Sequence, residues 1–112
     1  MSAETDAVLG HHVQAMMSCD LDEIMKDYCQ DSVLFTANGV ASGTEGIRAM
    51  FEELLKMFTP EKIANLKEVK QEANGDYVYV IWEMPPAVKT GCDTFHVRDG
   101  KIMMQSVIIQ PA

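Results

Sequence analysis

A histidine stands where the hydrophobic pattern of the first helix calls for an apolar side chain. Residues 4–18 placed at 100° steps form one broad apolar arc, and His12 lies near its middle. A polar ring in that position must find a hydrogen-bond partner or lose hydration free energy. One interpretation is a core histidine bonded to a backbone carbonyl. The other is a pocket histidine with a pKa near neutrality, which can act as an acid, a base or a hydrogen-bond donor.

A carboxyl group interrupts an otherwise apolar strand near the C-terminus. Alternation puts Asp93 on the same face as Phe95 and Val97. If that face is the inner one, apolar walls raise the pKa of Asp93 and keep it protonated. The alternative is an outward Asp93, or one near the strand end that pairs with a lysine. Together His12 and Asp93 could form a hydrogen-bonded dyad in a cavity, whereas His11 falls at the edge of the arc and is expected in solvent.

Other kinds of chemistry lack their residue patterns. Cys19, Cys29 and Cys92 form no C-x-x-C motif and no paired His/Cys spacing, so we expect reduced, mostly buried thiols rather than a zinc site or disulfides. No nucleophile elbow and no glycine-rich phosphate loop is present. The sequence therefore predicts neither a metal nor a cofactor.

The N-terminal half of the chain has the periodicity of helices. A second helix is predicted to begin at Asp20, whose carboxylate can cap the first turn while Glu23 reaches back to it. A third helix is predicted after Ser42-Gly43-Thr44, with Thr44 as its N-cap, and Thr59-Pro60 ends it.

The C-terminal half has the periodicity of strands. The turn signals Asn38-Gly39, Asn74-Gly75-Asp76 and Asp99-Gly100 separate the apolar runs. Strands are predicted at 32–36, about 64–73, 77–84, 92–98 and 101–110. Three helices followed by an antiparallel meander predict one α+β domain over residues 1–112, with the helices on one face of the sheet.

Both faces of the predicted sheet are apolar, which is unusual for a sheet covered by helices on one side. In the strand at 77–84 and again in the last strand, the two alternating sets of side chains are both hydrophobic. An apolar second face of several hundred Å² is larger than monomers usually expose. We expect a homodimer that buries this face. The alternative is a sheet curled tightly enough to bury both faces itself.

Composition excludes several kinds of partner. The chain has 112 residues, 47% of them hydrophobic, and a net charge of −8. Such an acidic chain is not expected to bind nucleic acid or anionic lipid. It has neither a bilayer-spanning apolar run nor a signal-peptide pattern at its start, so we expect a cytoplasmic protein. Its nine methionines are explained as core filling or, alternatively, as the lining of a promiscuous apolar pocket.

Three segments, together with the order of the elements, resemble a known superfamily. They are Cys19-Asp20-Leu21-Asp22-Glu23-Ile24, Tyr28-Cys29-Gln30-Asp31-Ser32-Val33 and Ser42-Gly43-Thr44-Glu45-Gly46-Ile47-Arg48-Ala49-Met50-Phe51. The chain is similar to the NTF2-like superfamily, and most to its SnoaL-like and ketosteroid-isomerase-like branch. The resemblance covers nearly the whole chain. It implies a cone-shaped α+β barrel, usually dimeric through its outer sheet face, with a deep apolar cavity between helices and sheet.

Some catalytic residues of ketosteroid isomerases have matching residues in this chain, and others are replaced. Ketosteroid isomerases use an Asp base and an oxyanion hole of Tyr plus a protonated Asp. The oxyanion-hole Asp falls on Asp93 and a supporting tyrosine on Tyr28, so these two match. The base falls on Thr36, the oxyanion-hole Tyr on His12, and a further network tyrosine on Phe51. Because Thr36 cannot abstract a carbon-bound proton at neutral pH, steroid isomerisation by that mechanism is not expected.

The same resemblance assigns the faces of the sheet. It directs Tyr79, Ile81, Val97 and Val107 into the cavity with Tyr28, Thr36 and Phe51, and it leaves Val80, Trp82 and Ile108 for the dimer face. The expected function is that of a pocket protein for a modest apolar or aromatic ligand. His12 and Asp93 could add isomerase-, cyclase- or hydratase-like acid–base chemistry. The alternative is a non-catalytic binding or dimeric interaction module with a vestigial pocket.

Overall fold

A single curved sheet forms one layer of the molecule. The computed structural model describes residues 2–112, so Met1, with which the expected domain begins, lies outside the described residues. The strand order is β2-β1-β6-β5-β4-β3; β1 pairs with β6 in parallel, and all other neighbours are antiparallel. The strands are β1 (Val33–Thr36), β2 (Gly39–Ser42), β3 (Lys67–Asn74), β4 (Tyr77–Met84), β5 (Val88–Arg98) and β6 (Lys101–Pro111).

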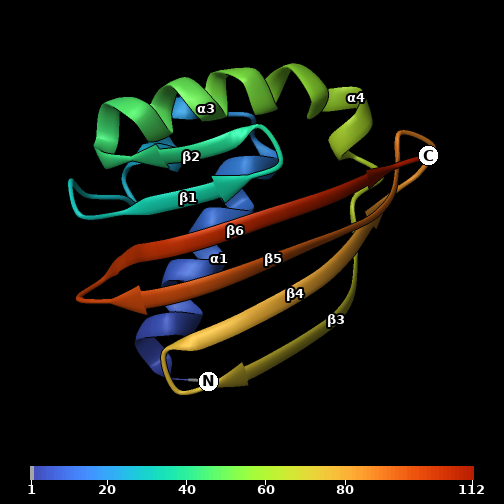
Figure 1. Ribbon diagram of the computed structural model, residues 1–112. Coiled ribbons are helices and arrows are strands. Elements are labelled where there is room, and N and C mark those ends of the chain that lie inside the picture. The colour runs from blue at the N-terminus through green and yellow to red at the C-terminus, as the bar shows by residue number, and fades with distance from the viewer. Residues whose placement is uncertain (1) are drawn as a thin grey trace.

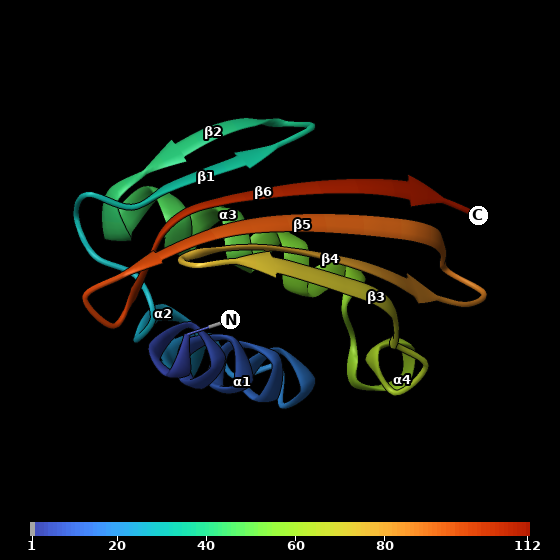
Figure 2. The same ribbon diagram turned by 90° about the horizontal axis from the view of Figure 1, so that it is seen from below.

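The helices form the second layer. They are α1 (Ala3–Met17), α2 (Leu21–Met25), α3 (Gly43–Met57) and α4 (Pro60–Ile63). Ser2 and Asp20 cap α1 and α2 by accepting hydrogen bonds from the backbone N–H of Thr5 and Glu23. Figure 1 shows α1 crossing behind the sheet, and Figure 2 shows α1 and α4 on the same side of its curve. The predicted α+β architecture, with helices packed on a curved sheet, is confirmed. The sheet is unclosed and mostly antiparallel, but the expected antiparallel meander does not include β1, which runs parallel to β6.

Several element boundaries differ from the sequence prediction. The strand at 77–84 and the turn at Asp99-Gly100 are as predicted, and both turn residues have positive φ, 53° and 73°. The short elements β2 and α4 were not predicted, and β5 begins four residues earlier than the expected residue 92. Ser42, not Thr44, holds the N-cap position of α3. The hairpin β1–β2 and the four-residue helix after Pro60 are too short for a hydrophobic period to develop.

The two faces of β4 are the reverse of those expected from the sequence. Val80 pairs with Asp93 and Trp82 pairs with Gly91, which puts Val80 and Trp82 on the inner face beneath the helices. Tyr79 and Ile81 therefore lie on the outer face. A shift of one residue reverses every side chain of a strand, and β4 is apolar on both sides, so its sequence does not fix the phase. Ile108 does lie on the outer face, as expected, and is 61% exposed.

The inner face and the helices enclose the buried core. Its largest fully buried side chains include Phe51, Ile24, Leu34, Ile47 and Ile102. Among residues 2–112, no helix has both the length and the hydrophobicity needed to cross a lipid bilayer.

Candidate functional site

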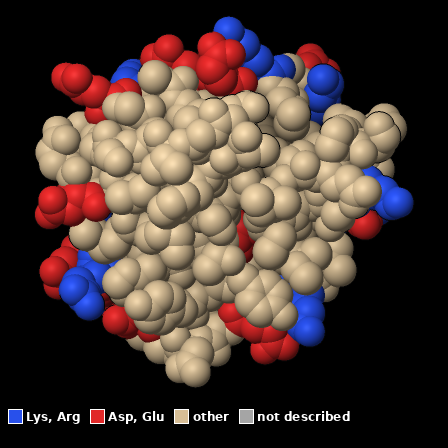
Figure 3. All heavy atoms as spheres, viewed as in Figure 1, with Lys and Arg blue, Asp and Glu red and all other residues tan. Residues whose placement is uncertain are grey.

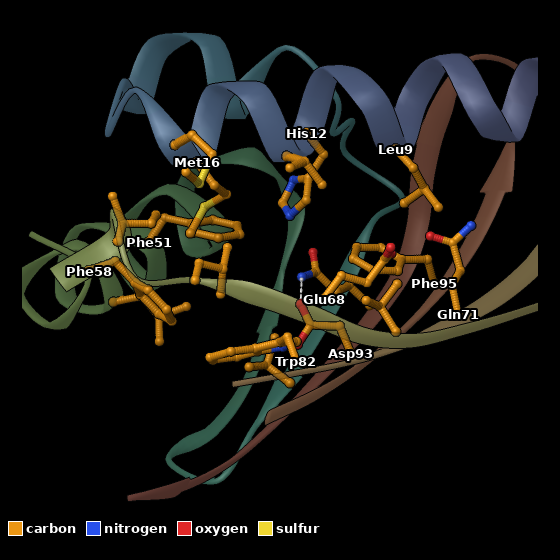
Figure 4. A pocket seen from close by; sticks show the side chains of 18 residues that line it. Leu9, His12, Met16, Phe51, Phe58, Glu68, Gln71, Trp82, Asp93 and Phe95 are labelled. Atoms are coloured by element: carbon orange, nitrogen blue, oxygen red, sulfur yellow. Dashed lines mark hydrogen bonds between the residues drawn. The ribbon is translucent and has the colours of Figure 1, made fainter. Parts of the chain in front are cut away.

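A cavity of about 370 Å³ lies between α1, α3 and the inner face of the sheet. It is large enough for a small organic molecule. Val13 and Met17 of α1 and Glu68 of β3 line it and are exposed, so the cavity opens between these two elements. Figure 4 shows the side chains that surround it. They are Leu9, His12, Val13, Met16, Met17, Phe51, Leu54, Phe58, Ile63, Leu66, Glu68, Gln71, Val80, Trp82, Asp93, Phe95, Gln105 and Val107.

His12 projects from the buried side of α1 into this cavity (Figure 4). Its ring lies edge-on to Phe95, Phe51 and Tyr28, with centroid distances of 5.4, 6.3 and 6.4 Å. The residue is 5% exposed, and its Nδ1 has no hydrogen-bond partner among residues 2–112. Burial, and to a lesser degree the charge of His11, lowers the pKa of His12 to about 4. The ring is therefore neutral at pH 7, and the interpretation that gave it a pKa near neutrality is wrong.

Asp93 lies on the opposite wall of the cavity and is held by two donors. Its Oδ1 accepts a hydrogen bond from Trp82 Nε1 at 3.1 Å, and its Oδ2 accepts one from Gln105 Nε2 at 3.0 Å. Burial raises the pKa of Asp93 to about 6, although both hydrogen bonds act in the opposite direction. The predicted rise is confirmed. At pH 7, however, the carboxyl group is mostly ionised.

The network continues from Asp93 to a buried tyrosine. Gln105 is 1% exposed, and its Oε1 accepts a hydrogen bond from the hydroxyl of Tyr28. Burial, followed by the charges of Asp93 and Asp27, raises the pKa of Tyr28, which therefore remains a neutral donor. No hydrogen bond joins His12 to Asp93 within residues 2–112, so the two groups share the cavity without forming the expected dyad.

Trp82 reaches Asp93 because β5 carries a glycine opposite it. The indole lies directly over Gly91, where an added Cβ would come within 2.2 Å of Trp82 Cε2. No larger residue fits beneath this ring without displacing it. From the sequence, Trp82 is expected on the dimer face, and Gln105 is not singled out. The signals that could have found them are the glycine at position 91, which leaves room for a large ring, and a polar amide within the apolar run of β6.

The expected lining residues divide into four groups. Phe51 and Val107 line the cavity with His12 and Asp93. Tyr28 and Val97 are buried beside it in the core, and Tyr28 reaches it through Gln105. Thr36 lines a smaller pocket of about 200 Å³, which shares Leu54 and Val107 with the main cavity. Tyr79 and Ile81 lie outside both pockets, on the outer face of the sheet.

His11 is not free in solvent as expected. Its Nδ1 lies 2.7 Å from Asp27 Oδ2 and its Nε2 lies 3.1 Å from Glu23 Oε1. The hydrogen bond to Asp27, followed by that to Glu23, raises the pKa of His11. These contacts join α1 to α2 outside the cavity. No group of three His, Cys, Asp or Glu residues in the described part of the chain could hold a metal ion.

Comparison with known proteins places this architecture in a family. The SnoaL-like domain family matches residues 9–104. The chain belongs to this family. Its fold is that of the NTF2-like superfamily, as the sequence resemblance implied. None of the curated protein sequences compared with the chain matches it.

Solved structures share this fold at low sequence identity. A SnoaL-like protein of unknown function from Burkholderia thailandensis is 18% identical, with a TM-score of 0.71 over 100% of this chain and 97% of that one. A putative polyketide cyclase from Sinorhizobium meliloti is 17% identical, with a TM-score of 0.67 over 95% and 99%. A de novo designed protein with a curved β-sheet is 24% identical, with a TM-score of 0.78 over 99% and 89%. Such identities establish the fold alone.

Proposed function

We propose that this SnoaL-like protein binds an apolar or aromatic small molecule in the cavity and that Asp93 exchanges a proton with it. The observation that carries the proposal is a carboxyl group with a pKa of about 6 in the wall of an apolar cavity. General acid–base catalysis works best when the pKa of the catalytic group lies near the working pH. A group in a cleft whose pKa is shifted toward neutral pH is also common at functional sites.

Asp93 and His12 have different roles in this proposal. Asp93 changes its charge near neutral pH, so it gives and takes the proton. His12 stays neutral, so it donates or accepts one hydrogen bond and orients a polar group of the ligand. The chemistry is of the isomerase, cyclase or hydratase kind, in which a proton moves to or from carbon. The S. meliloti neighbour, described as a putative polyketide cyclase, is consistent with that class.

Binding without catalysis is the second candidate. Trp82 and Gln105 already occupy both oxygens of Asp93, and the other carboxylate that lines the cavity, Glu68, is exposed at its mouth. A carboxylate held in this way could recognise a ligand without moving a proton.

We also infer that two copies of the chain pair through the outer face of the sheet. Phe35, Val40, Tyr77 and Ile108 are large, exposed hydrophobic residues of this face. Figure 3 views the same face and shows uncharged atoms over most of it, with charged side chains gathered at the rim. A second copy supplies a surface of the same shape and polarity, as symmetric dimers do.

The test of the proposed chemistry uses 1-indanone, a small bicyclic ketone with exchangeable protons beside its carbonyl group. Binding is followed through the indole N–H cross-peak of Trp82, the single tryptophan of the chain. Exchange of the ketone protons for deuterium in heavy water is followed by proton NMR. We expect the protein to accelerate this exchange and Asp93→Asn to abolish the acceleration while the ketone still binds. Asp76→Asn, in the exposed turn between β3 and β4, is the matched control.

Each result separates the candidates. Binding without accelerated exchange would favour the non-catalytic candidate. An indole cross-peak that does not move with added ketone would contradict a ligand-binding cavity.

A further inference from the structure

We propose that the ligand of this cavity carries a protonated amine on its apolar body, and that the carboxylate of Asp93 binds this cation. The inference rests on the proposed function, because it names the class of molecule that the cavity takes. It follows from the charges that surround the cavity and from those that are absent.

Every charged side chain that lines the cavity is acidic. Asp93 and Glu68 line it, and no lysine or arginine does so within residues 2–112. His12 is neutral at pH 7 because its pKa is about 4. An anionic ligand would therefore meet two carboxylates and no compensating cation.

The partners of Asp93 do not neutralise it. Trp82 and Gln105 each donate one hydrogen bond, and both are uncharged. The titratable groups that face Asp93 from the other elements are His12 of α1, Tyr28 after α2 and Glu68 of β3; Cys92 is its neighbour on β5. None of them is a cation at pH 7. A mostly ionised carboxylate thus lines an apolar cavity without a counter-ion.

This arrangement favours a cation from outside. When two ions are buried together, the loss of hydration of both usually offsets their attraction. Here folding has already removed much of the hydration of Asp93, so a bound ammonium loses only its own. The cavity is also lined by the aromatic rings of Phe58, Phe95 and Trp82, and the faces of such rings attract cations. An ammonium group with an apolar body therefore matches both the charge and the lining of the cavity.

The experiment compares three probes that share one indane body: 2-aminoindane, 2-indanol and indane-2-carboxylate. Their dissociation constants are measured at about pH 7.5 by calorimetry and by the Trp82 indole cross-peak. We expect the amine to bind at least about tenfold more tightly than the alcohol, a difference of about 1.4 kcal/mol. The carboxylate is expected to bind most weakly.

Two controls locate the effect at Asp93. Asp93→Asn should remove the preference for the amine and retain binding of the alcohol. Glu68→Gln, which neutralises the exposed carboxylate at the mouth, should reduce the preference by less than about threefold because solvent screens an exposed charge. In the unmodified protein the preference should shrink at about pH 5, where Asp93 is mostly protonated and His12 is still neutral. This last measurement does not depend on how well a variant folds.

The outcomes separate the inference from the proposed function. If none of the probes binds, the cavity is not a ligand site and both fall. If the alcohol binds as tightly as the amine, or if the preference for the amine survives both Asp93→Asn and low pH, the inference alone is wrong.

Discussion

The surroundings of Asp93 act on its charge in opposite directions. Burial opposes its charge, while the N–H groups of Trp82 and Gln105 stabilise that charge. The net effect is a carboxyl group that titrates near pH 6 instead of near 4. Stability should therefore depend on pH in a way that identifies this residue.

Replacement of Asp93 by asparagine should remove part of that pH dependence. The folded pKa is raised, so between about pH 4 and pH 6 the native state holds a proton that the unfolded chain releases, and the free energy of unfolding falls as pH rises. A shift from 3.8 to about 6 corresponds to about 3 kcal/mol. Relative to the unmodified protein, Asp93→Asn should gain about that much stability from about pH 4 to pH 7.5, as measured by urea unfolding. A difference that stays constant with pH would show that Asp93 has an ordinary pKa.

His12 contributes a polar atom that the fold does not use. Its Nδ1 is buried and has no partner in the part of the chain that the structure describes, which costs about 1–3 kcal/mol. Phenylalanine keeps a ring among Phe51, Phe95 and Tyr28 and removes the unpaired nitrogen. We therefore expect His12→Phe to be as stable as the unmodified protein or more stable by up to about 2 kcal/mol in thermal and urea unfolding, and to bind polar ligands more weakly. A clear loss of stability would instead indicate that the imidazole serves the core.

At the scale of elements, two consecutive histidines of α1, His11 and His12, contact different parts of the fold. His12 faces the sheet, while His11 contacts Asp27 and Glu23 and so ties α1 to α2. Burial raises the pKa of Asp27, while the hydrogen bond to His11 lowers it. The charged form of Asp27 is therefore stabilised by His11. The connection between α1 and α2 is therefore strongest while His11 is protonated.

Loss of His11 should weaken the protein mainly at low pH. The folded pKa of His11 is raised, so its contribution is complete below the unfolded pKa of 6.5 and is lost as pH rises through the folded value. Because the side chain is 36% exposed, we expect His11→Gln to cost only about 1 kcal/mol near pH 6 and less near pH 9. Urea unfolding at both pH values checks this. His96→Gln, on the outer face of the sheet, is the control, and an equal loss at both pH values would exclude the ion pair.

Regular elements could be predicted from the sequence because their signals are local. The strand at 77–84 lies between a glycine turn and two prolines, and Asp99-Gly100 needs only its own backbone to turn. The phase of β4 could not be predicted in this way. Both of its sides are apolar, so the side that faces the helices depends on the pairing with β5, in which Trp82 lies opposite Gly91.

The candidate site could be predicted in part. His12 and Asp93 stood out because each is polar in an apolar pattern, and the cavity contains both. The hydrogen-bonded network escaped prediction because Tyr28, Trp82 and Gln105 come from three separate segments. The ion pairs of His11 escaped for the same reason, since Glu23 and Asp27 reach it only once α2 has packed against α1.

At the scale of the whole molecule, the two faces of the sheet have different surroundings. The inner face is covered by helices and contains the cavity, while the outer face leaves Phe35, Val40 and Ile108 in solvent. A second copy of the chain would bury them. This pairing would leave the cavity mouth free, because the mouth is lined by α1, which lies on the other side of the sheet (Figure 2).

The dimer is tested by placing a charge on the outer face. The unmodified protein should have twice the chain mass of 12.5 kDa in light scattering at micromolar concentration, and Ile108→Glu should have the single mass. Val13→Glu places the same charge on an exposed apolar position of α1 and should remain a dimer. A single mass for the unmodified protein would contradict the pairing.

The most direct test of the site as a whole is the titration of the Asp93 carboxyl carbon by NMR, with Asp93→Asn used to assign the signal. The cavity described here predicts a midpoint near pH 6, which 2-aminoindane lowers by occupying the cavity beside the carboxylate. A midpoint near 3.8 that is indifferent to the added amine would mean that Asp93 is an ordinary solvated carboxylate and that the cavity has no proton-transfer group.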